Sequence, residues 1–191
     1  MGSLKNHDIL EIGCGNDLVS IISAQLGARV VASDISQTTL KLTKIGWIET
    51  QKKMQKNADG ERKLGQGSLT TFPIDMLARR SLPLSNSSEN RIIVTATALM
   101  YEADIAAALA KRAFEACVRG AWVIIGDDST GWREQGRNTF FATLDQLEEE
   151  KGISFERKMI SSSVKSKEFK WNEKPVVLIP LNPPDDIMFD K

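Results

Sequence analysis

The chain has 191 residues, of which 41% are hydrophobic and 26% are charged, and its 25 Lys and Arg residues balance 25 Asp and Glu residues. This profile is typical of one globular domain, which we expect to span residues 1–191, and the balanced charge favours neither nucleic acid nor a membrane as a partner. The sequence contains no secretory signal pattern and no membrane-length apolar run, and Cys14 and Cys117 lack metal-site spacing. We therefore predict an intracellular, cytoplasmic protein with reduced thiols and no metal.

The first predicted element is a short apolar strand, Ile9–Ile12, which leads into a turn containing Gly13 and Gly15. Apolar residues then recur at helical spacing and predict an amphipathic helix that Gly27 would end; they are Leu18, Ile21, Ile22 and Leu26. Residues 28–33 predict a second buried strand, which ends at Asp34.

A second helix is predicted from Ser36, a suitable N-cap residue, with apolar positions at Leu40, Leu42, Ile45 and Ile48. A polar turn region separates this helix from a third strand, 69–75, whose proline indicates a sheet edge or a strand end. Residues 91–98 predict a fourth strand. An alanine-rich helix over 103–118 follows, which Gly120 would end, and residues 121–126 form the next strand.

A long amphipathic helix is predicted over 133–151, ended by Gly152, with Phe140, Phe141, Leu144 and Leu147 on one face. Two strands, 153–160 and 175–180, follow it without an intervening helix. Alternation of strands and helices followed by a strand pair predicts an α/β fold. We expect a Rossmann-like, doubly wound, mostly parallel sheet with a C-terminal antiparallel strand pair.

The turn after the first strand has the residues of a ligand-binding loop. In open α/β sheets, ligands bind outside the carboxyl ends of the strands. Gly13 and Gly15 lack a Cβ atom, so the backbone can bend sharply and approach a ligand closely. Asp34, at the end of the second strand, is placed to accept hydrogen bonds from ribose hydroxyls.

Two cofactor classes share this arrangement. A nicotinamide dinucleotide loop, G-x-G-x-x-G, would need its third glycine at Leu18. S-adenosylmethionine loops are commonly E-x-G-x-G-x-G, which Glu11, Gly13 and Gly15 match, whereas Asp17 replaces the last glycine. The pattern therefore favours S-adenosylmethionine. A Rossmann-like turn that binds no ligand is the structural alternative.

Two later stretches strengthen this interpretation: ALMYEADIAAALAKRAF at 98–114 and AWVIIGDDSTGWREQGRNTFFATL at 121–144. Together with the glycine turn they resemble the class I (seven-β-strand) S-adenosylmethionine-dependent methyltransferases, over nearly the whole chain. More narrowly, they resemble the protein-lysine methyltransferase branch that includes the electron-transfer flavoprotein β-subunit lysine methyltransferase. That group commonly shows D-x-x-Y-E/D after the fourth strand, matched in part by Tyr101 and Glu102, and a G-D-P/S turn after the fifth, matched by Gly126 and Asp127.

The resemblance implies a cofactor site of five residues. Glu11 would approach the amino group of the methionine part, Gly13 and Gly15 would line the cofactor, Asp34 would bind ribose, and Asp75 would face the adenine amino group. Each of the three acidic residues has a plain structural alternative. Glu11 could be a strand residue with its carboxylate in solvent, Asp34 could cap the following helix, and Asp75 could simply begin the next turn.

The resemblance also implies catalytic roles for Tyr101, which would line the methyl-transfer channel, and for Glu102. A lysine acceptor, whose free pKa is about 10.4, must first lose a proton, and these two side chains are the local candidates to accept it. Packing alone would also explain Tyr101. The expected activity is methyl transfer to a protein lysine or another amine, with a protein substrate as the partner.

Three departures from the family pattern favour a second hypothesis, a non-catalytic methyltransferase-like binding or scaffold protein. Asp17 replaces a glycine, Ala98 stands where the branch usually has an acid, and the family's segment ahead of the first strand is expected to be lacking, which would leave the cofactor weakly held.

A basic series is interpreted as a solvated helix face, with an acidic-partner patch as the alternative: Lys41, Lys44, Lys52, Lys53, Lys56, Arg62 and Lys63.

Overall fold

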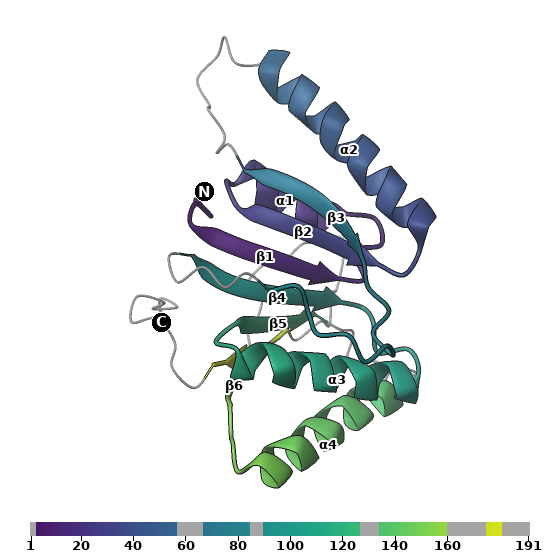
Figure 1. Cartoon of the computed structure of the whole chain (residues 1–191), viewed down its shortest axis with the longest axis vertical. Helices are drawn as coiled ribbons and strands as arrows, with labels where there is room; N and C mark the ends of the chain where they lie inside the picture. Colours follow the sequence, from purple (N-terminus) through teal and green to yellow (C-terminus); the bar gives the residue numbers. More distant parts are fainter. Residues whose placement is uncertain (1–2, 57–66, 85–89, 127–133, 160–174, 181–191) are drawn as a thin grey trace, which may run out of the picture. The chain divides into compact units, whose positions relative to one another are not determined.

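The structure is a computed structural model that describes residues 3–56, 67–84, 90–126, 134–159 and 175–180. In this part of the chain seven strands form one sheet in the order β3-β2-β1-β4-β5-β7-β6 (Figure 1). This confirms the predicted α/β, Rossmann-like fold. The chain divides into two compact units: Met1–Asp75 with Leu84–Thr95, and Met76–Pro83 with Ala96–Lys191. The expectation of a single domain over 1–191 stays a prediction.

The first unit contains β1 (His7–Ile12), α1 (Leu18–Gln25), β2 (Arg29–Asp34), α2 (Gln37–Lys56), β3 (Ser68–Pro73) and most of β4 (Arg91–Thr97). β1 pairs with β2, and β2 with β3, in parallel, so that the carboxyl ends of these strands lie at one edge. β3 is the outermost strand on this side, as its proline predicted. The core cluster of the unit comprises Ile9, Ala24, Ala28, Val30 and Trp47.

Helix α1 buries only part of the apolar face that its sequence predicted, because Ile21 and Leu26 are half-buried whereas the other two residues are exposed. Leu18 is 61% exposed and Ile22 is also exposed, whereas the buried residues of α1 are the small ones, Ser20, Ser23 and Ala24. At the end of α1 the backbone comes close to another segment. A Cβ atom at Gly67, just before β3, would overlap the carbonyl oxygens of Ala24 and Ala28. Small residues pack there, whereas Ile21 is the apolar residue of α1 that packs, partly buried, against the core cluster.

Helix α2 begins where Ser36 predicted it would. The Ser36 hydroxyl accepts a hydrogen bond from the Thr39 amide at 3.2 Å, which satisfies one of the free N–H groups of the first turn. Leu40 is buried as expected, but three further apolar residues of α2 are exposed, namely Leu42, Ile45 and Ile48. The buried face instead uses Thr43 and Trp47.

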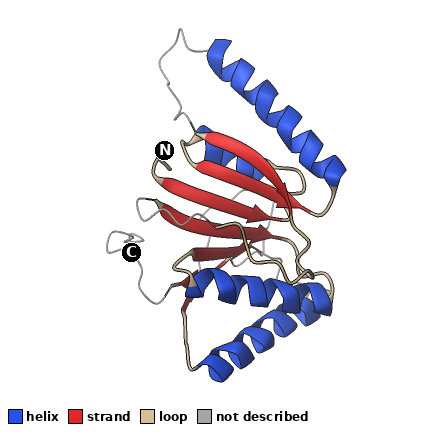
Figure 2. Cartoon of the chain, viewed as in Figure 1, coloured by secondary structure: helices blue, strands red, loops and turns tan. Residues whose placement is uncertain are grey.

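The second unit contains α3 (Ala103–Val118), β5 (Trp122–Gly126), α4 (Glu134–Lys151), β6 (Glu156–Met159) and β7 (Val176–Ile179). α3 packs against α4, as the two blue helices at the lower end of Figure 2 show. β7 lies between β5 and β6 and runs antiparallel to both, which confirms the predicted antiparallel pair. The strand predicted over 153–160 is shorter than expected, because Ile153 to Phe155 precede β6 without strand structure.

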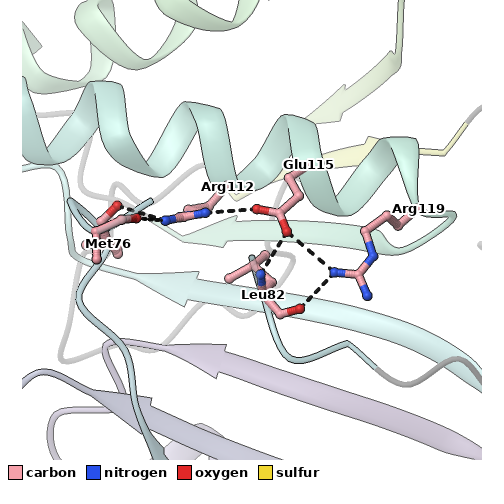
Figure 3. A network of polar contacts seen from close by, with 6 residues as sticks. Met76, Leu82, Arg112, Glu115 and Arg119 are labelled. Atoms are coloured by element: carbon pink, nitrogen blue, oxygen red, sulfur yellow. Dashed lines mark hydrogen bonds and ion pairs between the residues drawn. The ribbon is translucent and has the colours of Figure 1, made fainter. Parts of the chain in front are cut away.

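A polar network fastens the segment Met76–Pro83 to α3 (Figure 3). The buried Arg112 guanidinium donates to the carbonyl oxygens of Ala78 and Met76 and pairs with Glu115 at 2.9 Å. Glu115 in turn accepts the Leu82 amide at 2.7 Å. Backbone groups without a strand or helix partner are thereby satisfied by charged side chains, whose hydrogen bonds are stronger than neutral ones.

Candidate functional site

The turn after β1 is held against the end of β2 by a series of hydrogen bonds. Gly13 and Gly15 have positive φ angles of 67° and 48°, as a tight turn between a strand and a helix requires. The Cys14 amide donates to the Ser33 carbonyl at 2.7 Å, and the Ser33 hydroxyl donates to the Glu11 carbonyl at 2.6 Å. These hydrogen bonds give the turn a defined shape.

Asp34 joins this turn to the start of α2. One carboxylate oxygen accepts the Gly15 amide at 3.2 Å and the other accepts the Ser36 amide at 2.8 Å. Asp34 is not the cap of α2, since Ser36 holds that position, but its side chain orders the cap residue itself. A carboxylate has about four acceptor positions, so each oxygen retains capacity for one more donor, such as one of two neighbouring hydroxyls.

Glu11 lies beneath the turn and is 3% exposed. Its carboxylate accepts a hydrogen bond from the Ser20 hydroxyl of α1. Burial raises the pKa of the Glu11 carboxyl from 4.5 to about 7, the Ser20 hydrogen bond lowers it in part, and the nearby Asp17 charge adds to the rise. The alternative that this carboxylate lies in solvent is therefore wrong. Its contact with an amino group stays a prediction.

Asp17 has the backbone conformation that the missing glycine would have supplied, with φ 64° and ψ 4°. It is 7% exposed and accepts a hydrogen bond from the Thr43 hydroxyl of α2. Burial, followed by the charge of Asp34, raises the pKa of the Asp17 carboxyl. The substitution thus changes the side chain at this position while keeping the left-handed turn.

The remaining predicted residues are exposed and belong to other segments of the chain. Asp75 follows β3 in the first unit and is exposed, directly before a turn. Tyr101 and Glu102 belong to the second unit. Tyr101 is 47% exposed and Glu102 is the exposed N-cap residue of α3, with no capping hydrogen bond from its side chain. Their catalytic roles stay predictions. Asp127, the partner of Gly126 in the predicted turn, lies outside the described residues.

Ala98, which stands in place of the family's acid, has an unusual backbone conformation. Its φ angle is 56°, and its amide donates to the Gly126 carbonyl at 2.7 Å, joining the ends of β4 and β5. Positive φ is uncommon for residues with a Cβ atom. The turn after β4 is therefore tightly constrained next to Tyr101.

Three residues of the site were not predicted, namely Ser20, Ser33 and Thr43. Each is a buried hydroxyl that contacts the glycine turn or its acids. A usable signal existed for Ser20, because a small polar residue in the otherwise apolar stretch LVSII suits a buried hydrogen-bonding partner.

In the described part of the chain no group of three or more His, Cys, Asp and Glu residues is arranged to hold a metal ion. None of the helices described there is long and apolar enough to cross a membrane.

Solved structures with similar folds identify the architecture. A methyltransferase from Methanosarcina mazei superposes with a TM-score of 0.56 at 15% identity, over 94% of this chain and 95% of that chain. The chain has the class I methyltransferase fold. Magnesium protoporphyrin IX methyltransferase from Synechocystis, with bound S-adenosylhomocysteine, gives a TM-score of 0.52 at 16% identity over 93% and 75% of the two chains. Ribosomal protein L11 methylase from Lactobacillus delbrueckii gives 0.53 at 14% identity over 93% and 71%.

Similarity in sequence is confined to a short segment of this methyltransferase fold. Over 57 residues the chain is 33% identical to the ubiquinone biosynthesis O-methyltransferase of Bordetella avium, a match that covers 30% of this chain and 24% of that protein. No protein-family model matches the chain. The match thus spans about a quarter of the curated relative's length, and the comparisons establish the fold rather than a particular acceptor.

Proposed function

We propose that this chain binds S-adenosylmethionine at the glycine turn and transfers its methyl group to an amine, with a protein lysine as the acceptor. The observation that carries the proposal is the position of Asp34. Its carboxylate is fixed at both oxygens by the Gly15 and Ser36 amides and retains one acceptor position on each. Two neighbouring ribose hydroxyls match that pair of acceptors.

The residues around the turn fit this cofactor better than a dinucleotide. Glu11, Asp17 and Asp34 place three carboxylates around one turn, close enough that the charges of Asp34 and Glu11 both influence Cys14. A cationic ligand such as S-adenosylmethionine favours ionisation of these acids, Glu11 included, and is attracted by their negative charge, whereas the pyrophosphate of a dinucleotide is repelled by those that are ionised. Among the described residues, a Cβ atom at Gly15 would meet only the Gly13 carbonyl oxygen, at 4.0 Å, which is consistent with a ligand on the outer side of the turn.

When bound, S-adenosylmethionine supplies a methyl group already activated on sulfur, so the protein contributes mainly orientation and exclusion of water. On this proposal Glu11 supports the turn from below and faces the amino end of the ligand, while Asp34 holds the ribose. Tyr101 and Glu102 follow β4, where an acceptor amine would arrive. The Glu102 carboxylate would accept the proton that a lysine must lose before it attacks, and the Tyr101 hydroxyl would accept a hydrogen bond from the amine.

The choice of a protein lysine rests on the Tyr101-Glu102 pair and its resemblance to the protein-lysine branch. Among proteins with this fold, one is named for a porphyrin substrate and another for a ribosomal protein, so the fold itself does not select the acceptor. Ala98 supports the second candidate, a protein that binds the cofactor without turnover, because alanine offers no carboxylate where the branch has one.

The test is a calorimetric titration with S-adenosylhomocysteine, with NAD as the control ligand, followed by transfer of labelled methyl groups to lysine-containing proteins. We expect S-adenosylhomocysteine to bind and NAD not to bind. Absence of S-adenosylhomocysteine binding would refute the cofactor assignment. Binding without any methyl transfer to lysine would support the non-catalytic alternative.

A further inference from the structure

The contacts of Asp17 suggest a function for a residue that first looks like a defect in the loop. A non-glycine residue at φ 64° carries a backbone cost, which is smallest for Asn and Asp because their short polar side chains bond locally. Here the side chain reaches across to another helix instead. The hydroxyl of Thr43, 26 positions later on α2, donates to the Asp17 carboxylate.

Thr43 is itself held in place. It is completely buried, and its hydroxyl also contacts the Thr39 carbonyl oxygen at 3.0 Å and the Cys14 sulfur at 3.6 Å. Gly46, one turn further along α2, lets the helix approach: a Cβ atom there would lie 3.2 Å from Ile21 and 3.6 Å from the Asp17 carboxylate. The glycine turn is therefore fastened to β2 through Asp34 and to α2 through Asp17.

We propose that Asp17 is a positioning residue, which fixes the glycine turn in its ligand-binding shape through the Thr43 hydroxyl and so makes the turn and α2 a single rigid part. A glycine at position 17 would allow the same φ angle without fastening the turn. Aspartate adds the hydrogen bond to Thr43, which glycine cannot form. The expected effect of this bond on ligand affinity rests on the proposed binding of S-adenosylmethionine. Asp17 touches α2 rather than the reacting atoms, so its effect is on the shape of the turn.

Glycine substitution at position 17 separates this proposal from the view of Asp17 as a defect. If the fastening matters, Asp17→Gly weakens S-adenosylhomocysteine binding by about tenfold, or about 1.4 kcal/mol, although it restores the family pattern. If aspartate is only a defect, the same substitution tightens binding. Thr43→Val should weaken binding to a similar extent, Thr43→Ser should restore it, and the exposed Thr38→Val on the same helix should have no effect.

Amide hydrogen exchange of the ligand-free protein gives a readout that needs no cofactor. We expect exchange at residues 13–17 to be faster by about tenfold in Asp17→Gly and Thr43→Val than in the wild type, with Thr43→Ser and Thr38→Val unchanged. The double variant should be no faster than either single one, since both remove the same bond. Unchanged exchange in both single variants would overturn the proposal. Wild-type protein that binds no S-adenosylhomocysteine would refute the proposed function instead, and exchange would still decide whether Asp17 fixes the turn.

Discussion

The hydroxyl of Ser20 donates a hydrogen bond to the carboxylate of Glu11, and both side chains are almost completely buried. A carboxylate in this position is costly to ionise, as its raised pKa shows. One hydroxyl donor replaces only part of the hydration that the charged group has in water. The pair links β1 to α1 directly below the glycine turn. The carboxyl that is unfavourable to ionise therefore lies where we propose that a cationic ligand binds.

We expect the ligand-free protein to lose stability as the pH rises from 4.5 to 7. Over this range the folded protein keeps a proton on Glu11 that the unfolded chain releases, since the pKa is about 7 in the folded state and 4.5 otherwise. The shift corresponds to roughly 3 kcal/mol. Urea unfolding at several pH values should show this loss in the wild type but not in Glu11→Gln. Parallel pH profiles for the two proteins would contradict the prediction.

Replacement of Asp34 should weaken S-adenosylhomocysteine binding. Asp34→Ala removes the proposed hydrogen bonds to the ribose, at a cost of about 1.5–3 kcal/mol for a charged acceptor. Asp34→Asn keeps one carbonyl oxygen and should lose less. Calorimetry measures both, with Glu49→Gln on the exposed side of α2 as the control. An unchanged affinity in Asp34→Ala would mean that this carboxylate does not touch the ligand.

The substitution Gly136→Ala should destabilise the protein by about 1–3 kcal/mol, the range for overpacking. Its Cβ atom would overlap the Met100 carbonyl oxygen, next to Tyr101, and backbone cannot move aside as a side-chain end can. Gly46→Ala is the matched control, because it also lies within a helix but its Cβ atom would meet only side-chain ends, that of Ile21 at 3.2 Å and that of Asp17 at 3.6 Å. We expect Gly46→Ala to be neutral or stabilising in thermal unfolding. Equal effects of the two substitutions would refute the packing argument.

Arg112→Ala should destabilise the protein by roughly 2–4 kcal/mol, because Glu115 and the carbonyls of Ala78 and Met76 lose a buried partner. Arg112→Lys should restore little of this, since an ammonium group cannot reproduce the planar, forked donor geometry. Denaturant unfolding provides the measurement, with the exposed Lys111→Ala as the control. A loss below about 0.5 kcal/mol, the usual range for surface substitutions, would show that the network in Figure 3 contributes little.

The substitution Ala98→Gly should stabilise the protein by about 0.5–1 kcal/mol. The relief of a left-handed alanine, about 1–2 kcal/mol, exceeds the entropy that glycine adds to the unfolded chain. Ala96→Gly, at a buried strand position of ordinary φ, should instead destabilise. Thermal unfolding of the two variants gives opposite shifts if the strain at Ala98 is real, and shifts of the same sign if it is not.

Local signals in the sequence predicted much of the fold. Ser36 marked the start of α2 through its side-chain cap, and Gly120 and Gly152, both at positive φ, marked the ends of α3 and α4. These features depend on neighbouring residues only, so a single sequence contains them. The position of Asp34 beside Gly15 was also foreseeable, because parallel strands bring their carboxyl ends to one edge.

Features that depend on long-range packing were not predicted. Leu18 and Ile22 have the spacing of a core face, yet both are exposed, and the backbone at Gly67, some forty residues later, packs closely against Ala24 instead. The Asp17–Thr43 hydrogen bond likewise joins residues on separate elements. The periodicity of apolar residues describes one helix at a time. It contains no information on which other segment of the chain packs closest to that helix.

The placement of β7 between β5 and β6 has a consequence for synthesis of the chain. All four residues of β7 are buried, and the strand supplies the hydrogen bonds on one side of β5 and of β6. Until residue 179 has emerged from the ribosome, β5 and β6 each present an unpaired edge to the cell. Open edges of this kind pair readily with other strands. The second unit is therefore most exposed to mispairing late in translation, whereas β1, β2 and β3 can already assemble.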